Sequence, residues 1–366
     1  MRVARISHSG VVSAWRQRER ELVALGIEVQ MVCAARWVEG GGIVELTGSD
    51  AARDGFVEPA RTIGSHPNLF LFDPRPLWKL LGDRTVDLVD IHEEPFSLVM
   101  AEVLLLKWLR RNTAPFVLYS AQNLDKSYPP PFSWIERYAL RHSSGSYVCN
   151  HAAADRLVRR GLQAPAVVLP LGVDLSLFHP RQRGAPSGSL AVGFVGRLAL
   201  HKGLVPLVEA LRSEPRWSLT LVGDGPDRGI VEERAHELGI ADRVTIAGHA
   251  DQESLAEHYR TFDVLAVPSL PTPSWTEQFG RVAVEAMAAG VPVVTSDAGA
   301  LPEVVGDAGI VVPAGDAAAL HDALAALAHD HDRWDALRAA GLERARRFTW
   351  EAVAAAHGAM YASVRR

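Results

Sequence analysis

The chain has 366 residues, of which 48% are hydrophobic, and a formal net charge of −5. This length predicts two domains, and the hydrophobic content is enough for a core in each. The slightly acidic balance argues against a general nucleic-acid binder, so we expect no nucleic-acid partner. Cys33 and Cys149 each end an apolar run, which predicts buried free thiols in a reducing compartment and offers no metal site.

The first half alternates short apolar runs with helical patterns, as parallel β-α-β units do. Its opening ten residues predict a first strand and not a signal peptide, because no long apolar stretch follows them. The charged run at 16–20 predicts one exposed helix face. Residues 37–66 are glycine-rich and irregular, which predicts a long loop over a cleft. Further strands are expected at 86–92, 115–123, 144–150 and 165–172.

The most lipid-like stretch is "FSLVMAEVLLLKWLRR", residues 96–111. It is too short and too charged to span a bilayer, because Glu102 and Lys107 interrupt it. Two interpretations stay open: a helix packed on the N-terminal sheet, which we favour, and an amphipathic helix whose basic end touches a membrane surface. We therefore expect a cytoplasmic protein, with peripheral contact to the inner face of the membrane left open.

The composition changes over residues 173–189, where Gly, Pro and Ser are frequent, and a linker is expected there. The alternation then restarts, which predicts an α/β fold of two doubly wound parallel-sheet, Rossmann-like domains facing across a cleft. The domains are expected at 1–172 and 190–349, and the last helix, 350–366, has the length and position to complete the first. Strands of the second domain are expected at 190–196, 218–225, 243–249, 263–269, 291–297 and 309–315.

Ligands in such folds bind at the carboxyl ends of strands, and the loop "GFVGRLALHKG" (193–203) has suitable residues there. A strand ends at Gly196, and two cations, Arg197 and Lys202, follow in a loop that opens a helix. Glycine allows close backbone approach, a helix N-terminus favours an anion, and two cations can hold a diphosphate. The alternative is an ordinary strand–loop–helix turn with surface cations.

Two carboxylates, Glu277 and Glu285, have seven residues between them and flank a Phe279-Gly280 step. A helix is expected from about 280 to 289, because glycine and proline follow it. Carboxylates accept hydrogen bonds from hydroxyls, while amides at a helix N-terminus attract negative charge. The pattern therefore suits a polyhydroxylated anionic ligand. The alternative is a helix cap at Glu277 and a solvated helix residue at Glu285.

These motifs, in this order, resemble those of glycosyltransferase family four, whose members have the GT-B fold. The E-x7-E signature of that family matches Glu277 and Glu285, and its G-R-L…K-G element matches residues 196–203. The resemblance covers most of 165–366, and the first half matches only in outline. Further matching segments are "GVDLSLF" (172–178), "LVGDGP" (221–226) and "FTWE" (348–351).

The resemblance implies transfer with retention of anomeric configuration. It implies a nucleotide-diphosphate sugar as co-substrate, with no tightly bound cofactor and no metal. The catalytic residues would be Arg197, Lys202 and Glu277. Both cations would neutralise the diphosphate and face it rather than the carboxylates, and Glu277 would bind and orient the sugar without covalent attack. The other implied donor contacts are Gly196 for the diphosphate, Glu285 for the ribose, Gly248 and His249 for the base, and the amides of Phe279 and Gly280 for the sugar and diphosphate.

The first half departs from the family pattern in two places. Many relatives have a glycine pair where "SHSGVVS" (7–13) has only Gly10, and many have a histidine where Gln122 and Asn123 stand. Neither amide can transfer a proton as a histidine does, so sugar or acceptor contacts are expected of them. A structural role in a loop is the alternative for His92. The candidate acceptor-site residues are His8, Ser9, Gly10, His92, Gln122 and Asn123.

The leading hypothesis is a hexosyltransferase-type enzyme with a hydroxyl acceptor, either a natural product, a polysaccharide or a lipid-linked glycan. A nucleotide-sugar epimerase or phosphorylase is an alternative, which the E-x7-E and G-R…K-G motifs argue against. A relative that binds a nucleotide sugar as a sensor is a further alternative. The role of Trp275 is open between a wall of the sugar pocket and packing of its own loop.

Overall fold

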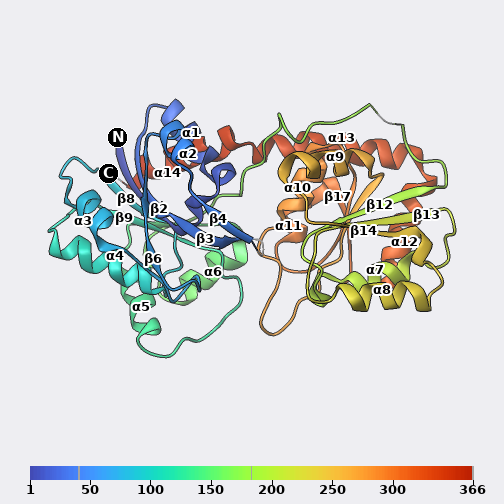
Figure 1. The fold of residues 1–366 in the computed structure, drawn as a ribbon, viewed down its shortest axis with the longest axis horizontal. Coiled ribbons are helices and arrows are strands. Elements are labelled where there is room, and N and C mark those ends of the chain that lie inside the picture. Colours follow the sequence, from blue (N-terminus) through green and yellow to red (C-terminus); the bar gives the residue numbers. More distant parts are fainter. Residues whose placement is uncertain (40–41, 183, 365–366) are drawn as a thin grey trace. The chain divides into compact units, whose positions relative to one another are not determined.

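A computed structural model describes residues 1–39, 42–182 and 184–364 of the chain. The chain forms two compact units, Met1–Pro170 together with Trp350–Arg366, and Leu171–Thr349 (Figure 1). The last helix, α14 (Trp350–Val364), therefore belongs to the first unit. Residues 171–189 belong to the second.

The first unit is built on one parallel sheet. Its seven strands, counted over the described residues, all pair in parallel. In spatial order they are β11 (Ala166–Val168), β10 (Gly145–Val148), β9 (Phe116–Ser120), β8 (Leu88–Ile91), β1 (Arg2–Ser7), β2 (Glu28–Ala34) and β5 (Val57–Ala60).

Both faces of this sheet are covered by helices, which is why its strands are apolar on both sides. Val3 and Met31 belong to one hydrophobic core, and their neighbours Ala4 and Val32 belong to another, as the two-residue period of a strand requires. Helices α1 (Gln17–Ala24) and α14 contact each other on the first face. The second face carries α3 (Pro74–Gly82), α4 (Leu98–Leu109), α5 (Phe132–His142) and α6 (His151–Arg159).

The expectation of an exposed helix face at 16–20 is wrong, because Arg16, Arg18 and Glu19 are buried. Their charges are compensated inside the fold, as buried charges must be: Arg16 Nε lies 2.7 Å from the carboxylate of Asp54, and Arg18 and Glu19 pair with each other.

The glycine-rich region 37–66 is more regular than expected, although residues 40 and 41 lie outside the described part. Its strand β5 extends the main sheet by pairing with β2, so the region contributes to the scaffold. The other elements here are the hairpin β3 (Arg36–Glu39) and β4 (Gly42–Glu45), the helix α2 (Gly48–Arg53), and β6 (Thr62–Ile63), which pairs with β7 (Leu71–Phe72).

The second unit repeats the architecture with six parallel strands in its described residues. The predicted class, two doubly wound parallel sheets, is thereby confirmed. In spatial order the strands are β14 (Val244–Gly248), β13 (Trp217–Val222), β12 (Leu190–Val195), β15 (Val264–Val267), β16 (Val293–Ser296) and β17 (Gly309–Val312). The helices are α7 (Leu204–Ala210), α8 (Arg228–Glu237), α9 (Gln252–Thr261), α10 (Arg281–Ala288), α11 (Leu301–Val305), α12 (Ala317–His329) and α13 (His331–Ala345).

Both cysteines are free and buried, as the sequence predicts. Burial raises the pKa of Cys33 to about 12 and that of Cys149 to about 11, so neither thiol ionises readily at neutral pH. Among the helices of the described residues, none has the length and hydropathy needed to cross a bilayer.

Candidate functional site

The carboxyl edge of the second sheet is lined by glycine backbone. The neighbouring strands β12, β13 and β14 end at or just before Gly196, Gly223 and Gly248. The Gly223 amide donates to the Gly248 carbonyl at 2.7 Å, and a Cβ on Gly223 would lie 2.0 Å from the Gly196 oxygen. Only glycine permits this approach, which leaves peptide groups rather than side chains at the strand ends.

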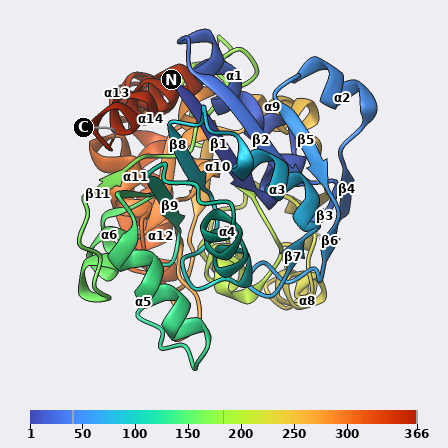
Figure 2. The ribbon, with the colours of Figure 1, turned by 90° about the vertical axis from the view of Figure 1, so that its left-hand side faces the viewer.

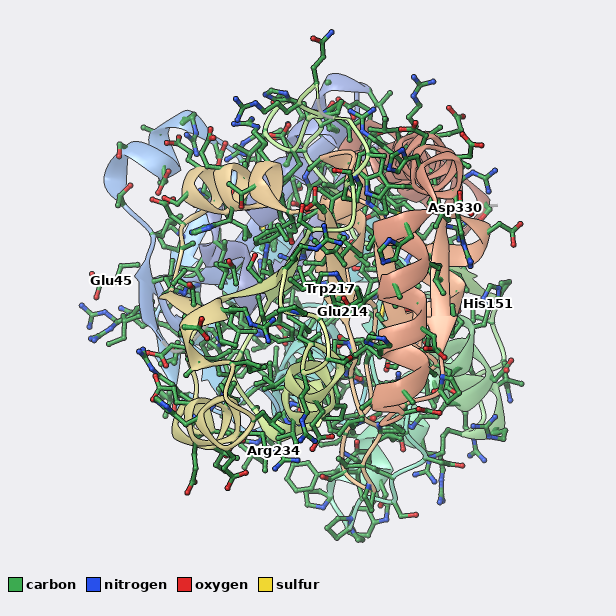
Figure 3. The ribbon with its side chains drawn as sticks, turned by 90° about the vertical axis from the view of Figure 1, so that its right-hand side faces the viewer. Glu45, His151, Glu214, Trp217, Arg234 and Asp330 are labelled. Carbon is green, nitrogen blue, oxygen red and sulfur yellow. The ribbon has the colours of Figure 1, made fainter. Side chains whose placement is uncertain are left out.

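The opposite edge of the same sheet is closed by a side chain. Arg243 donates to the carbonyl oxygens of Glu214 and Trp217 at 2.6 and 2.8 Å, and Figure 3 labels both of these residues. These contacts lie at the amino ends of β13 and β14, opposite the carboxyl edge at which such folds bind their ligands.

The loop after β12 is held against the loop after β15. Gly203 has a φ of 74°, and a Cβ there would lie 1.8 Å from the Pro268 carbonyl oxygen. The Leu270 amide donates to the His201 carbonyl at 2.7 Å. Because the two loops are joined through their backbones, the 3₁₀ turn η3 (Leu200–Lys202) and the segment that follows Pro268 form one frame.

This frame brings Lys202 and Glu277 together. Lys202 Nζ lies 2.8 Å from Glu277 Oε2, and the Ser269 hydroxyl donates to the same oxygen at 3.1 Å. The side chains remain 21% and 13% exposed. The expectation that Lys202 faces away from the carboxylates is therefore wrong, because an unpaired carboxylate so near a cation would forgo a charge-assisted hydrogen bond.

Trp275 packs beside this pair. Its ring centroid lies 4.5 Å from Lys202 Nζ and 4.3 Å from the centroid of the His201 ring. A cation over an indole face is an attractive arrangement. Trp275 thus packs against the Lys202 loop, a contact that neither of the two roles left open for it describes.

The backbone on both sides of Glu277 is also fixed by glycine. The Ala300 amide donates to the Glu277 carbonyl at 3.0 Å. Gly299 has a φ of 59°, and a Cβ there would lie 2.1 Å from that carbonyl oxygen. Gly280, with a φ of 85°, is the N-cap of α10 and supplies no side-chain cap. Because glycine has no side chain, the cap residue offers no side-chain acceptor to the first amides of the helix, and a Cβ on Gly280 would lie 3.9 Å from Glu277 Cγ.

Glu285 lies in a different environment from Glu277. It is buried on α10, where the Tyr259 hydroxyl donates to Oε2 at 2.9 Å. Burial raises the pKa of Glu285, and the nearby charge of Arg281 opposes that shift. The alternative of a solvated helix residue is therefore wrong. The two glutamates of the motif therefore have separate partners: Tyr259 bonds to Glu285, and Lys202 bonds to Glu277.

The remaining donor-side candidates divide by exposure. Arg197 and His249 are exposed, the first on the Lys202 loop and the second directly after β14. Phe279 is buried, and its ring centroid lies 5.9 Å from that of Phe348. Its side chain is thus part of the core, so Phe279 can offer a ligand only its backbone.

In the first unit, His8 and Glu93 meet where β1 and β8 end. Ile6 is paired with Ile91 in the parallel register, so His8 and Glu93, two residues further, are also neighbours. The His8 amide donates to Glu93 Oε1 at 2.7 Å, and Nδ1 lies 2.8 Å from both carboxylate oxygens. The ring of Trp37, on β3, lies 4.6 Å from that of His8. These contacts make a fixed, half-buried imidazole at this edge.

His92 lies one strand end away and is held by aromatic residues. Its Nδ1 lies 2.9 Å from the Tyr147 hydroxyl, and its ring stacks on Tyr119 with centroids 4.0 Å apart. Burial, and then the charge of Arg5, hold the pKa of His92 well below its usual value. The imidazole is therefore neutral at pH 7 and acts as a hydrogen-bonding group.

The other acceptor-side candidates have structural contacts. Gln122 Oε1 accepts from the Leu124 amide at 3.1 Å, and its Nε2 donates to the Tyr128 hydroxyl at 3.2 Å. Asn123 follows it and is half-buried. A Cβ on Gly10 would lie 2.0 Å from Met31 Cε and 2.9 Å from Cys33 Cβ, so a side chain there would displace the Met31 side chain and crowd Cys33. The Ser9 hydroxyl is 2.9 Å from that of Ser7. Over the residues described, no cluster of three or more His, Cys, Asp or Glu side chains could hold a metal ion.

Comparison with known families accounts for both units. Residues 177–345 match the glycosyl transferases group 1, and residues 8–177 match glycosyltransferase family 4. The chain belongs to glycosyltransferase family four.

Curated relatives of this family match part of the chain. The D-inositol 3-phosphate glycosyltransferase of Segniliparus rotundus is 36% identical over 204 residues, which is 51% of this chain and 44% of the relative. The phosphatidyl-myo-inositol mannosyltransferase of Mycobacterium leprae is 34% identical over 230 residues, which is 59% of this chain and 60% of the relative. The chain spans about half the length of the curated relatives that it matches.

Solved structures match over nearly the whole chain. A sucrose-phosphate synthase from Thermosynechococcus elongatus has a TM-score of 0.68 at 22% identity, covering 100% of this chain and 99% of its own. Anabaena HepE in complex with UDP has a TM-score of 0.76 at 18% identity, covering 99% and 100%. At these identities the likeness shows the fold, which is GT-B, as the motifs predict.

Three residues that contact the candidate site are not among its predicted residues. Ser269 and Tyr259 each donate to a motif glutamate, and Glu93 holds His8. A sequence signal exists for Glu93 and Ser269, because both stand at the carboxyl ends of predicted strands. Tyr259 is an ordinary residue of a helix, so its role depends on three-dimensional packing.

Proposed function

We propose that the protein is a retaining glycosyltransferase that moves a sugar from a nucleoside-diphosphate sugar to a hydroxyl acceptor. The observation that carries the proposal is the Lys202–Glu277 pair, 2.8 Å apart, beside the glycine-lined ends of β12, β13 and β14. A cation and a carboxylate at one point match the two parts of such a donor. The cation suits the diphosphate, and the carboxylate suits the sugar hydroxyls.

Donor binding would exchange the partners of this pair. Partly exposed ion pairs contribute at most about 1 kcal/mol, so a dianionic diphosphate can draw Lys202 away at little cost. Glu277 would then keep the hydrogen bond from Ser269 and turn its other lone pairs to the sugar. Before this exchange, the ion pair keeps both side chains close to the positions that they need.

Leaving-group stabilisation would supply the main catalytic effect. Charge develops on the β-phosphate as the glycosidic bond breaks, and Arg197 and Lys202 lie on the same loop to compensate it. The N-terminus of α10 at Gly280 adds a partial positive charge. One such preorganised contact is commonly worth on the order of 10²–10³ in rate. Front-face attack lets the departing phosphate oxygen take the acceptor's proton, so no protein nucleophile is required.

The nucleoside would be held by Glu285 and by the loop after β14. Glu285 is fixed through one oxygen by Tyr259, which leaves its other oxygen for the ribose hydroxyls. Gly248 and the exposed His249 follow β14 at the same edge and would lie near the base. Because HepE was solved with UDP, uridine is the first base to test.

The acceptor would bind at the carboxyl edge of the first sheet. His8, oriented by Glu93, and the neutral His92 are groups that can bond a hydroxyl there. Ser9 and Gly10 share the loop of His8, and Gln122 and Asn123 follow the neighbouring strand β9. Relatives are named for D-inositol 3-phosphate and phosphatidyl-myo-inositol, so phosphorylated polyols are the first acceptors to test.

The test is nucleotide release measured with UDP-, GDP-, ADP- and TDP-sugars, with and without a candidate acceptor. We expect release that depends on an acceptor and on one nucleotide, with product of unchanged anomeric configuration. Lys202→Ala should lower kcat/KM on the order of 10²–10³-fold. Glu277→Gln should lower kcat more than it weakens UDP binding, since Glu277 is assigned to the sugar.

The matched control is Arg234→Ala. Arg234, on α8 (Figure 3), forms an ion pair with Glu209 on α7 at 2.6 Å. Neither is a candidate site residue, so the loss of Arg234 should leave the rate unchanged. UDP that raises the melting temperature without any sugar transfer to any acceptor would indicate a binding relative and overturn the proposal. Full activity of Lys202→Ala would overturn the site assignment.

A further inference from the structure

The exposed aromatic side chains of this protein are concentrated on one layer of helices. Of the Phe, Trp and Tyr side chains in the described residues, only Trp78, Trp108, Trp134 and Tyr138 are exposed. They lie on α3, α4 and α5, and Trp108 and Trp134 are 73% and 63% accessible. Burying large aromatic rings is favourable, so their exposure in a single layer marks a surface that is covered by something else.

These helices form one continuous layer on the first unit. Helix α4 contacts α3 on one side and α5 on the other, and Figure 2 shows it between them. The exposed residues on α4 are Leu105, Trp108 and Leu109, spaced so that they share one side of the helix. The opposite side of α4 is buried in the core, so these side chains point out of the layer.

An arginine accompanies every exposed ring at a spacing of three residues. Three of the pairs are Trp108 with Arg111, Trp134 with Arg137, and Tyr138 with Arg141; the fourth is Trp78 with Arg75. Of these arginines, Arg75 is paired with Asp73. Arg111, Arg137 and Arg141 are exposed and form no ion pair within the described residues.

The acidic residues of α4 and α5 do not offset these cations at the surface. Glu136 is buried and pairs with Arg156 and Arg160 at 2.8 and 2.7 Å. Glu102 accepts from the Phe72 amide at 2.9 Å, and burial raises its pKa to about 7. The outer face is therefore basic, on a chain whose net charge is −5.

We propose that this outer face of α3, α4 and α5, which we name the tryptophan face, docks on an anionic phospholipid surface. Tryptophan and tyrosine are the side chains that favour the headgroup region, where one part is apolar and the other hydrated. Arginines extend from the same surface to the lipid phosphates. The chain lies on the bilayer through this face and does not span it.

Charge favours a membrane over a second protein copy. A two-fold interface would place the unpaired arginines of one tryptophan face against those of the other, and like charges so placed oppose association. The core of a protein interface is also depleted in charge, whereas here a cation stands within one helical turn of each ring. The proposal concerns only this face, so it holds or fails independently of the transfer reaction.

The test is co-sedimentation of the full chain with vesicles of phosphatidylcholine, with and without phosphatidylglycerol, at low and high salt. We expect at least about tenfold stronger partitioning onto the phosphatidylglycerol vesicles, weakened by salt. Arg137→Gln/Arg141→Gln should weaken that partitioning about fivefold per arginine. Trp108→Ala/Trp134→Ala should weaken it about tenfold and reduce the blue shift of tryptophan fluorescence, to which Trp78 still contributes.

The controls remove exposed arginines and exposed apolar side chains from the second unit. Arg212→Gln/Arg333→Gln neutralises two exposed arginines, and Ile230→Ala/Val311→Ala truncates two exposed apolar residues; neither should change partitioning. Circular dichroism and melting temperature establish that each variant is folded. Equal binding to both vesicle types, no binding, or face variants that behave like the controls would overturn the proposal. So would a loss of self-association in the face variants, which would assign the face to a second copy.

Discussion

At the scale of single residues, the position of Glu277 depends on glycines that have no direct contact with a substrate. Gly203 and Gly299 have positive φ angles, and the space of each absent Cβ is occupied by a carbonyl, from Pro268 and from Glu277 itself. These contacts fix the two loops that carry Lys202 and Glu277. A methyl group at either glycine would displace the neighbouring carbonyl, and the Lys202–Glu277 ion pair would move with that loop.

We predict that Gly203→Ala is destabilising and impairs the donor site. A left-handed alanine and the displaced Pro268 carbonyl together should cost about 1–3 kcal/mol of unfolding free energy. UDP binding should weaken in parallel, because Lys202 moves with the loop. Urea unfolding and calorimetry measure the two effects.

Gly229→Ala is the control for that change. Gly229 lies in α8 with no heavy atom within 4 Å of a Cβ built there. Alanine should stabilise the helix by about 0.5–1 kcal/mol. Equal effects of the two substitutions would contradict the role given to Gly203.

The sequence predicts which residue types gather at the site but not how they pair. The spacing of Glu277 and Glu285 and the cations after Gly196 follow from local patterns. The 2.8 Å contact of Lys202 with Glu277 joins positions 75 residues apart, and no periodicity encodes it. The meeting of His8 with Glu93 needs the knowledge that β1 and β8 are neighbours.

At the scale of elements, α14 completes a buried charge network on the first sheet. Arg5 on β1 pairs with Asp90 on β8 and Glu19 on α1. The hydroxyls of Tyr147 and Tyr361 both donate to Asp90, the second from α14. Removing one partner from a buried pair usually destabilises strongly, because the other charge remains without compensation. The contacts of α14 therefore contribute to stability out of proportion to their number.

We predict that Tyr361→Phe lowers the free energy of unfolding by about 1–3 kcal/mol, since Asp90 loses a buried hydrogen bond. Tyr138→Phe removes the same hydroxyl from an exposed position on α5 and should leave stability unchanged. Both are measured by urea unfolding. A neutral Tyr361→Phe would mean that Asp90 is satisfied without α14.

This network also explains why the helix pattern at 16–20 misleads. By sequence, "RQRER" is a solvated face. Arg18 is buried because it contacts His357, which lies on α14 more than 300 residues later in the chain. Local periodicity predicts that a helix forms, whereas its solvent exposure is determined by whichever element packs on it.

At the scale of the whole molecule, buried histidine links stability to pH. His357 Nδ1 lies 2.9 Å from the Val353 carbonyl, so it is the protonated nitrogen, and Nε2 accepts from Arg18 at 3.0 Å. Burial lowers the pKa of His357 to about 3. In the unfolded chain His357 binds a proton near pH 6.5, whereas in the folded chain it stays neutral down to about pH 3. The free energy of unfolding therefore falls as pH falls from about 6.5 toward 3.

We predict that His357→Gln removes the contribution of one titrating group to the pH dependence of the free energy of unfolding. The stability difference between wild type and variant should shrink by about 1.4 kcal/mol per pH unit over that window. The comparison with wild type is required because Glu102, whose pKa is raised to about 7, has the opposite effect between about pH 4.5 and 7. Urea unfolding at pH 7, 6 and 5 provides the measurement. A constant difference across these pH values would show that His357 titrates normally.

The alternation of strands and helices predicts both sheets, because each parallel strand that is buried on two faces must be a short apolar run. It does not predict that the region 37–66 contributes β5 to the first sheet. An edge strand with Pro59 in it lacks the apolar continuity of the central strands. The family motifs were the better guide to the second unit, where they lie at strand ends.

The discontinuity of the first unit has a consequence for biosynthesis. Residues 171–349 are contiguous, so the second unit can fold as soon as it leaves the ribosome. The first unit cannot be completed before α14, which is translated after all of the second unit. Until then, Tyr361 and His357 are not in place to bury Arg5 and Asp90. We therefore expect the part of the chain that is made first to reach its native state last, and nascent chains to need chaperone protection mainly at their amino-terminal half.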